Sequence, residues 1–256
     1  MLRKGDLTQG GITGTLLHFT LPMMVGSFLQ QCYNIADTLI VGQCIGAGAL
    51  AAVGSAYTLM VFLISVLLGL AMGSGTVFSL HYGAGNYVAL RRSIFSSFVL
   101  IGIVTLILNV AVFIWLDPIL RLLQVPQDIY GMMRSYLWII FCGIVFTFIY
   151  NFYASLLRAV GDSVTPLWFL AVSVVLNIAL DLFFILQLDW GIQGAAAATV
   201  LAQGVAALGI IIYTYRRRPE LRWHHEDMCF DRTCLKEIAS FSTCLLYTSP
   251  SPRDTR

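Results

Sequence analysis

Charged residues are scarce in this sequence of 256 residues. Only 11% of its residues are charged, against about a quarter in ordinary soluble proteins, and 58% are hydrophobic. The mean hydropathy is +0.82. This composition excludes an ordinary soluble domain and indicates a protein of the lipid bilayer. We read the small net charge of +2 as a result of membrane topology, so it predicts no nucleic-acid partner.

Metal-binding and disulfide patterns are also lacking. The six cysteines make no disulfide framework, because Cys32 and Cys142 lie inside apolar segments. The remaining candidates for a metal cluster, which fit no standard zinc spacing, are His224, His225, Cys229 and Cys234. No phosphate-binding loop is present either. We therefore expect no metal site, no cofactor and no direct coupling to ATP.

Six long segments are almost free of charge, and each is long enough to cross a bilayer, which takes about 20 residues of helix. No Lys or Arg lies deep inside any of them. The first is too long for a cleavable signal peptide, and five more follow it. The predicted fold is an all-α integral membrane bundle of six transmembrane helices, over residues 16–41, 50–78, 93–116, 132–157, 166–186 and 192–215.

The arginines indicate the orientation of these helices. Basic residues precede the first segment and follow the second, the fourth and the sixth, whereas the alternate connections carry few. By the positive-inside rule both ends of the six-helix block face the cytoplasm. We expect a multi-pass protein of the cell's plasma membrane, with its N-terminus in the cytoplasm.

Of thirteen acidic residues, only Asp37 and Asp181 sit well within apolar segments. A buried charge at that depth marks a functional site by default, because it must face partners, water or an ion. Asp37 shares a helix face with Gln30 and Asn34, which precede it by seven and three residues. Pro22 lies fifteen residues before Asp37 and predicts a bend, static or switchable, in the first helix.

The fifth and sixth segments repeat this polar pattern. Thr165 and Pro166 suit the N-cap and first turn of a helix. Asn177 and Asp181 follow one turn apart, so both side chains share a face and offer hard oxygen ligands. The sixth segment begins with small residues, which allow close helix packing. This small-residue run ends at Thr199, whose hydroxyl either completes the cluster or bonds its own helix.

These motifs together resemble transporters of the multidrug and toxic compound extrusion (MATE) family, over residues 10 to about 240. The resemblance rests on Pro22 and Asp37 in the first helix, on the glycine- and alanine-rich run of residues 41–54, and on Arg158-Ala-Val-Gly161-Asp162. It rests equally on Asn177-Ile-Ala-Leu-Asp181 and on the run Gly191-Ile-Gln-Gly194-Ala-Ala-Ala-Ala198-Thr199.

The resemblance implies twelve helices in two lobes, of which this chain holds the N-terminal one. It implies export of cationic or amphipathic drugs in exchange for H⁺ or Na⁺ taken up by the cell. It also implies a cation site formed by Asp37, Asn177, Asp181 and Thr199. Binding there would neutralise the acids, repack the first helix about Pro22 and release the drug. The candidate lining of the drug cavity is Gln30, Tyr33, Asn34 and Tyr136.

Other readings of the same residues stay open at this point. Flippases for lipid-linked sugars share the fold, but a phosphate-bearing cargo calls for basic residues in the helices. Ser74 and His81 could suggest a serine hydrolase, although they lack an orienting third group, so we predict no enzyme and no catalytic residue. A third reading is a half-transporter that is inactive on its own.

The chain divides into three parts by composition. Residues 1–215 form the six-helix lobe, and residues 216–243 form a cytoplasmic linker with the start of a seventh helix. Residues 244–256 resemble the translation of an adapter used to prepare DNA libraries, and we interpret them as an artefact. On this interpretation the natural chain is longer and continues into the missing C-terminal lobe.

Overall fold

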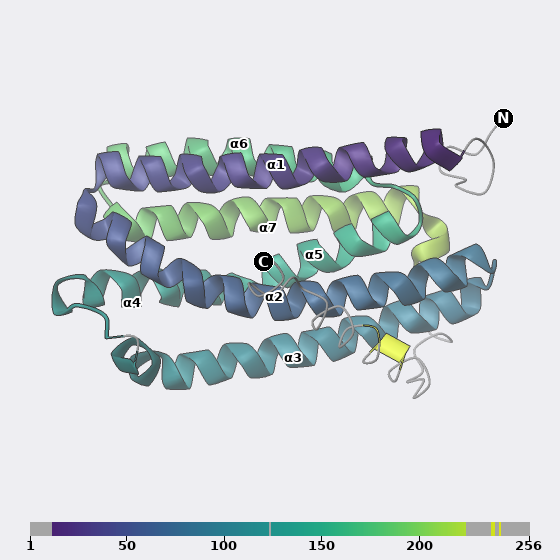
Figure 1. Cartoon of the computed structure of the whole chain (residues 1–256), viewed down its shortest axis with the longest axis horizontal. Coiled ribbons are helices and arrows are strands. Elements are labelled where there is room, and N and C mark those ends of the chain that lie inside the picture. Colours follow the sequence, from purple (N-terminus) through teal and green to yellow (C-terminus); the bar gives the residue numbers. More distant parts are fainter. Residues whose placement is uncertain (1–11, 123, 224–236, 239–240, 242–256) are drawn as a thin grey trace, which may run out of the picture.

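The structure is a computed structural model that describes residues 12–122, 124–223, 237, 238 and 241. Within these residues the long elements are helices, packed side by side along one axis of the molecule (Figure 1). They are α1 (Ile12–Cys44), α2 (Ala47–Gly83), α3 (Tyr87–Leu122), α4 (Gln127–Cys142), α5 (Ile144–Ala159), α6 (Val164–Leu182) and α7 (Gly191–Arg217). The π-helix η1 (Phe183–Gln187) extends α6, and the 3-10 turn η2 (Pro219–Leu221) follows α7.

Most of the predicted apolar segments are helices that can cross a membrane. Among the described residues α2, α3, α7 and the combined helix Val164–Gln187 are long and apolar enough, and α4 with α5 qualifies as a bent pair. The 33-residue α1 is not counted among these spans. The prediction of an all-helical membrane bundle is confirmed.

The prediction of one continuous helix over residues 132–157 is wrong. α4 ends at Cys142, α5 begins at Ile144, and the two axes differ by 47°. Val200 of α7 packs against the backbone of Gly143 between them, where a Cβ atom would lie 2.7 Å from Val200 Cγ1. Periodicity could not reveal this break, because apolar residues continue through it.

α7 lies inside the bundle and packs against α4, α5 and α6. Its buried face is made of small side chains, which let neighbouring helices approach closely. The fully or almost fully buried members of this face are Ala195, Ala196, Ala198, Ala202, Ala206 and Ala207. α1 sits at the edge of the bundle, where it packs chiefly on α6 and less on α2. The bundle therefore has a closely packed centre at α7 and a less embedded helix at α1.

The start of α6 differs from the predicted N-cap at Thr165. α6 begins at Val164, and the carboxylate of Asp162 in the preceding loop accepts hydrogen bonds from the Thr165 N–H at 3.0 Å and its hydroxyl at 2.8 Å. The same carboxylate lies 3.5 Å from the guanidinium of Arg218 after α7. Asp162 is thus the capping residue and Thr165 the residue that is capped. Through Arg218, Asp162 also connects the start of α6 to the end of α7.

Arginines gather at one end of the bundle. They stand at the start of α3, at the end of α5 and at the end of α7, namely Arg91, Arg92, Arg158, Arg216, Arg217, Arg218 and Arg222. The opposite end carries Arg121 and Arg134. Arg134 Nε contacts Asp117 at 2.9 Å, and that carboxylate also accepts a hydrogen bond from Tyr130 at 2.8 Å, which joins α3 to α4.

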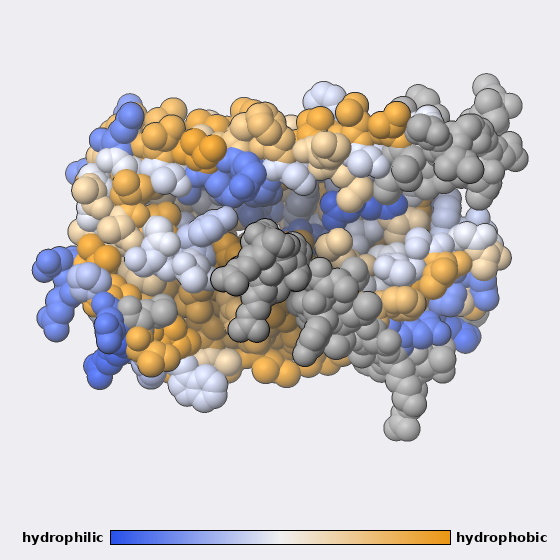
Figure 2. Space-filling model, in the orientation of Figure 1, coloured by the Kyte–Doolittle hydropathy of each residue, from blue (hydrophilic) through white to orange (hydrophobic). Residues whose placement is uncertain are grey.

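Large apolar side chains cover the outside of the bundle. Phe62, Ile114 and Val175 are 67%, 66% and 69% exposed. Figure 2 shows hydrophobic residues spread along the helices on the visible face, with hydrophilic residues at the ends and in the middle. Such a surface is costly in water and suits a hydrocarbon environment.

Asp162→Ala should destabilise the purified chain by about 1–2 kcal/mol, because it removes the cap of α6 and a partly buried ion pair. Asp162→Asn keeps an oxygen acceptor but loses the charge, so it should cost less than the alanine variant. Thermal unfolding in detergent measures both. Equal losses for the two variants would contradict a capping role.

Candidate functional site

The two intramembrane acids meet in the structure. Asp37 comes from α1 and is 9% exposed, while Asp181 comes from α6 and is fully buried. The two carboxyl groups are neighbours, close enough to interact with each other. One oxygen of each, Oδ1, is buried without a hydrogen-bond partner among the described residues. Two acids that face each other in this way favour any cation that can sit between or beside them.

Asn177 connects Asp181 to α7. With its amide nitrogen turned to the carboxylate, Asn177 donates to Asp181 Oδ2 at 3.0 Å, and its oxygen accepts from the Thr199 backbone N–H at 3.2 Å. The end of the amide that faces α7 also lies 3.3 Å from the Thr199 hydroxyl. The opposite orientation would set an amide oxygen against a carboxylate. Asn177 thereby holds α6 and α7 together at the site.

Two tyrosines complete the cluster. The Tyr33 hydroxyl of α1 lies 3.4 Å from the Thr199 hydroxyl. Tyr136 of α4 is 4% exposed and close enough to Asp37, Asp181 and Tyr33 to interact with them electrostatically. The structure thus brings together six predicted residues from four helices: Tyr33, Asp37, Tyr136, Asn177, Asp181 and Thr199.

Gln30 and Asn34 do not join this cluster by any hydrogen bond described for α1. The Asn34 amide donates to Gln31 Oε1 at 3.1 Å on the outer side of the helix, and its backbone oxygen accepts from Thr38. Gln30 is partly buried. Their part in a cavity wall stays a prediction.

α1 continues as one helix through Pro22 and appears in Figure 1 as an unbroken rod. Pro22 precedes Asp37 by fifteen residues, or about 22 Å along the helix axis. Leu167 of α6 packs on this part of α1, beside Gly26. A switch between straight and bent forms of α1 stays a prediction.

The cluster lies off the centre of the bundle. Asp37 precedes the end of α1 at Cys44 by seven residues, and Thr199 follows the start of α7 at Gly191 by eight. These separations put the cluster about 10–12 Å from the helix ends opposite the arginine-rich end. The site is therefore closer to this end of the bundle than to the arginine-rich end.

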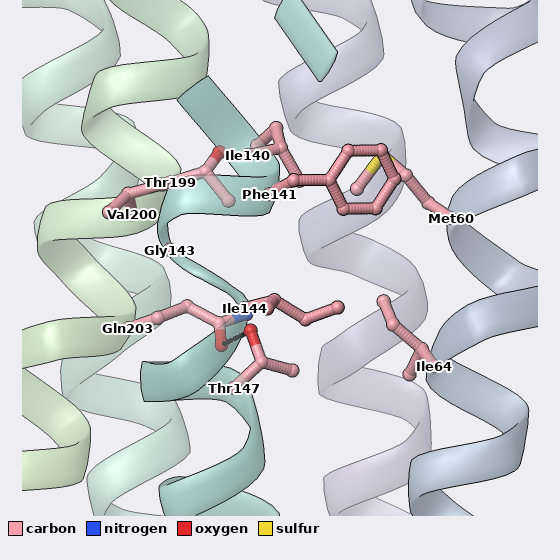
Figure 3. A pocket seen from close by; sticks show the side chains of 10 residues that line it. All are labelled: Met60, Ile64, Ile140, Phe141, Gly143, Ile144, Thr147, Thr199, Val200 and Gln203. Atoms are coloured by element: carbon pink, nitrogen blue, oxygen red, sulfur yellow. Dashed lines mark hydrogen bonds between the residues drawn. The ribbon is translucent and has the colours of Figure 1, made fainter. Parts of the chain in front are cut away.

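A cavity of about 40 Å³ adjoins the cluster at Thr199. It lies between α2, α4, α5 and α7, and its walls are mostly apolar, with Met60, Ile64, Phe141 and Ile144 among them (Figure 3). Its polar edge is made by Thr199 and by the Thr147 hydroxyl, which donates to Gln203 Oε1 at 2.8 Å. Sequence reasoning missed Thr147, Gln203 and Gly143, because single polar or glycine residues within long apolar helices give no distinct signal.

Ser74, one of the two residues that could suggest a serine hydrolase, has a structural role. Ser74 is fully buried and its hydroxyl donates to the Leu70 carbonyl of its own helix at 2.9 Å. At Gly75, a Cβ atom would lie 2.5 Å from the Ser155 hydroxyl oxygen, so this glycine lets α2 and α5 approach. The Gly-Ser-Gly run of residues 73–75 thus lies where α2 packs closely on α5.

The candidate zinc ligands His224, His225, Cys229 and Cys234 lie outside the described residues, as do residues 244–256 and most of the predicted seventh helix. Within the part that the structure describes, no group of three His, Cys, Asp or Glu residues could hold a metal ion.

Comparison with known families decides the classification. The family model described as MatE matches residues 22–183 of this chain. The chain belongs to the MatE family. Similar proteins of this family include "Probable multidrug resistance protein YpnP" of Bacillus subtilis, which is 37% identical over 217 residues, or 85% of this chain and 49% of YpnP. "Multidrug export protein MepA" of Staphylococcus saprophyticus is 32% identical over 210 residues, or 79% of this chain and 45% of MepA.

The MatE fold is also evident from solved structures. An outward-facing multidrug resistance MATE family transporter superposes with a TM-score of 0.88 at 25% identity, covering 97% of this chain and 56% of the other. The chain spans about half the length of the curated relatives that it matches. The predicted family and the predicted fold of one half of such a transporter are confirmed.

Asp37→Asn should raise the thermal stability of the purified chain in Na⁺-free buffer at pH 8, by about 1 kcal/mol. A neutral amide at position 37 can donate a hydrogen bond to Asp181 and removes the repulsion between two carboxylates. Asp37→Leu is the matched control, since it removes the charge without supplying a donor. A loss of stability in the asparagine variant as large as in the leucine variant would refute charge repulsion at this site.

Proposed function

We propose that this chain is the N-terminal lobe of a cation-coupled antiporter that exports drugs or other cationic and amphipathic compounds. The observation that supports this proposal is the buried pair Asp37–Asp181, set among Asn177, Thr199 and two tyrosines at the meeting point of α1, α6 and α7. A membrane protein keeps two acids at this depth when they bind something.

The donor set suits H⁺ or Na⁺ as the transported coupling ion. Carboxylate, amide and hydroxyl oxygens are hard ligands, and the unpartnered Oδ1 atoms of both acids are open to a cation. A proton shared between the acids or a Na⁺ beside them removes the like-charge repulsion. The structure favours neither ion, and we expect no resident metal or cofactor.

The cavity of about 40 Å³ next to Thr199 is too small for a drug, which needs about 300 Å³ or more. The exported compound is therefore proposed to bind where this lobe faces the second one, with Asp37 and Asp181 attracting its positive charge. When a cation neutralises the acids, this attraction is lost and α1 repacks on α6, about Pro22. Uptake of the ion and release of the drug are then linked through one cluster.

The proposed setting is the plasma membrane, with the arginine-rich end and the N-terminus in the cytoplasm. The cluster then lies in the outer half of the bilayer, where an ion from outside reaches it first. The other wall of the drug path is proposed to come from a second lobe that the chain itself does not hold, and an isolated first lobe is inactive in transport.

A flippase for lipid-linked sugars is less well supported. Apart from Arg134, which lies in the middle of α4 and pairs with Asp117, the arginines of α1 to α7 lie near helix ends, and the cluster itself is acidic. A phosphate-bearing headgroup calls for the reverse charge.

Cation binding should be measurable on the purified chain by thermal unfolding. Na⁺ should raise the melting temperature compared with choline at equal ionic strength. At a Na⁺ concentration a hundredfold above its Kd, the free energy of unfolding should rise by about 2.7 kcal/mol. If H⁺ is the ion, the stability that the acid pair contributes should instead increase as the pH falls and be lost as it rises. Asp181→Asn should remove the response, and Asp117→Asn, a change at the surface, should keep it. A wild-type chain that responds like Asp181→Asn would contradict the cation site.

Coupling can be tested by joining residues 1–241 to the matching second half of YpnP and expressing the chimera in a drug-sensitive strain. Asp37→Asn should abolish resistance while the amount of protein in the membrane stays the same, and Asp117→Asn should leave resistance intact. Efflux at the wild-type level from the Asp37→Asn chimera would disprove the coupling role of this acid.

A further inference from the structure

The break between α4 and α5 lies next to the cation cluster in three dimensions. Gly143 forms the break, and Val200 of α7, which packs on it, is the neighbour of Thr199 (Figure 3). A Cβ atom at position 143 would lie 2.7 Å from Val200 Cγ1, 3.0 Å from its Cβ and closer still to Cγ2. Real Cβ atoms do not come this close to other atoms. The place of α7 beside the break therefore depends on glycine at position 143.

The break is built into the surrounding bundle. Helix ends leave carbonyl groups without partners, which cost free energy inside a membrane. The Phe141 carbonyl at the end of α4 accepts a hydrogen bond from the Asn109 side chain of α3 at 3.0 Å. The other side-chain atom, Asn109 Oδ1, is buried without a partner in the described residues. Asn109 therefore caps the end of α4 with its amide nitrogen, while its amide oxygen makes no hydrogen bond in the described residues.

Both helices that meet at the break reach the cluster or its surroundings. Tyr136, seven residues before Gly143 on α4, is close enough to Asp37 and Asp181 to interact with them electrostatically. Thr147, four residues after Gly143 on α5, donates to Gln203 of α7, one turn beyond Thr199. The 47° bend allows one chain segment to contact the acid pair at one end and α7 at the other.

We propose that Gly143, with Asn109 as the cap of the break, is a positioning residue of the cation site. It sets the distance of α7 from α4 and so places the Thr199 hydroxyl within reach of Asn177 and Tyr33. This inference rests on the proposed cation binding by Asp37 and Asp181. A coordinating oxygen must be held within about 0.5 Å of its productive place, so a small displacement of α7 weakens binding.

The test is the Na⁺ or H⁺ dependence of thermal unfolding of the full 256-residue chain. Gly143→Ala should weaken the cation response about tenfold, read as the concentration for half-maximal stabilisation. Asn109→Ala, which removes the side-chain hydrogen bond to the Phe141 carbonyl, should weaken it severalfold and serves as the milder variant. The matched control is Gly131→Ala, also in α4, where a Cβ atom meets nothing within 4 Å.

A second substitution distinguishes a displaced α7 from a general loss of stability. Val200→Ala removes the two closest atoms, so Gly143→Ala combined with Val200→Ala should recover cation affinity to within about threefold of wild type. The melting temperature without cation reports the fold independently of the site.

The outcomes distinguish this inference from the function on which it rests. A cation response in the wild type that Gly143→Ala leaves unchanged overturns the positioning role alone, even if the melting temperature without cation falls. Failure of Val200→Ala to restore affinity also overturns it, because the steric link between the two residues would be absent. A wild-type chain without any cation response overturns the proposed function, and the positioning role with it.

Discussion

Acids buried among apolar helices must find their partners inside the protein, because lipid supplies none. Asp37 and Asp181 impose this constraint on the whole bundle. They require α1 to lie on α6, they require Asn177 to bridge towards α7, and they require α7 to come close enough for Thr199 to take part. The small side chains of α7 permit that approach. The need to give two buried acids partners inside the protein thus accounts both for the site and for the packing of α1, α6 and α7.

Much of this arrangement could be predicted from the sequence. Charge-free segments of sufficient length fix where the helices run, and spacing along a helix places Asn177 and Asp181 on the same side. That Asp37 faces Asp181 could be expected only from the resemblance, since nothing in the local sequence relates α1 to α6. The roles of these residues in binding go beyond what their positions alone can establish.

The features that could not be predicted depend on contacts between helices distant in sequence. The break at Gly143 looks like the middle of an apolar helix until Val200 is seen against it. At the start of α6, Asp162 and Thr165 are both capping residues by type, and Asp162, the one that caps, also pairs with Arg218, 56 residues away. In both cases local propensity allows several answers, and tertiary contacts select one. Gln30 and Asn34 share a helix face with Asp37 but make no described hydrogen bond to the cluster, so their place in a cavity wall stays a prediction.

The off-centre place of the acid cluster has an electrical consequence. On the proposed orientation Asp37 lies about 10 Å from the outer end of α1, a helix longer than the hydrocarbon core of about 30 Å, so an ion from outside crosses at most about a third of that core. On arrival it has therefore crossed at most about a third of the membrane potential, worth at most about 0.8 kcal/mol per charge at 100 mV. The larger share of the voltage acts on the second part of its path, towards the cytoplasm. In such a carrier the membrane potential drives the release of the ion more than its capture.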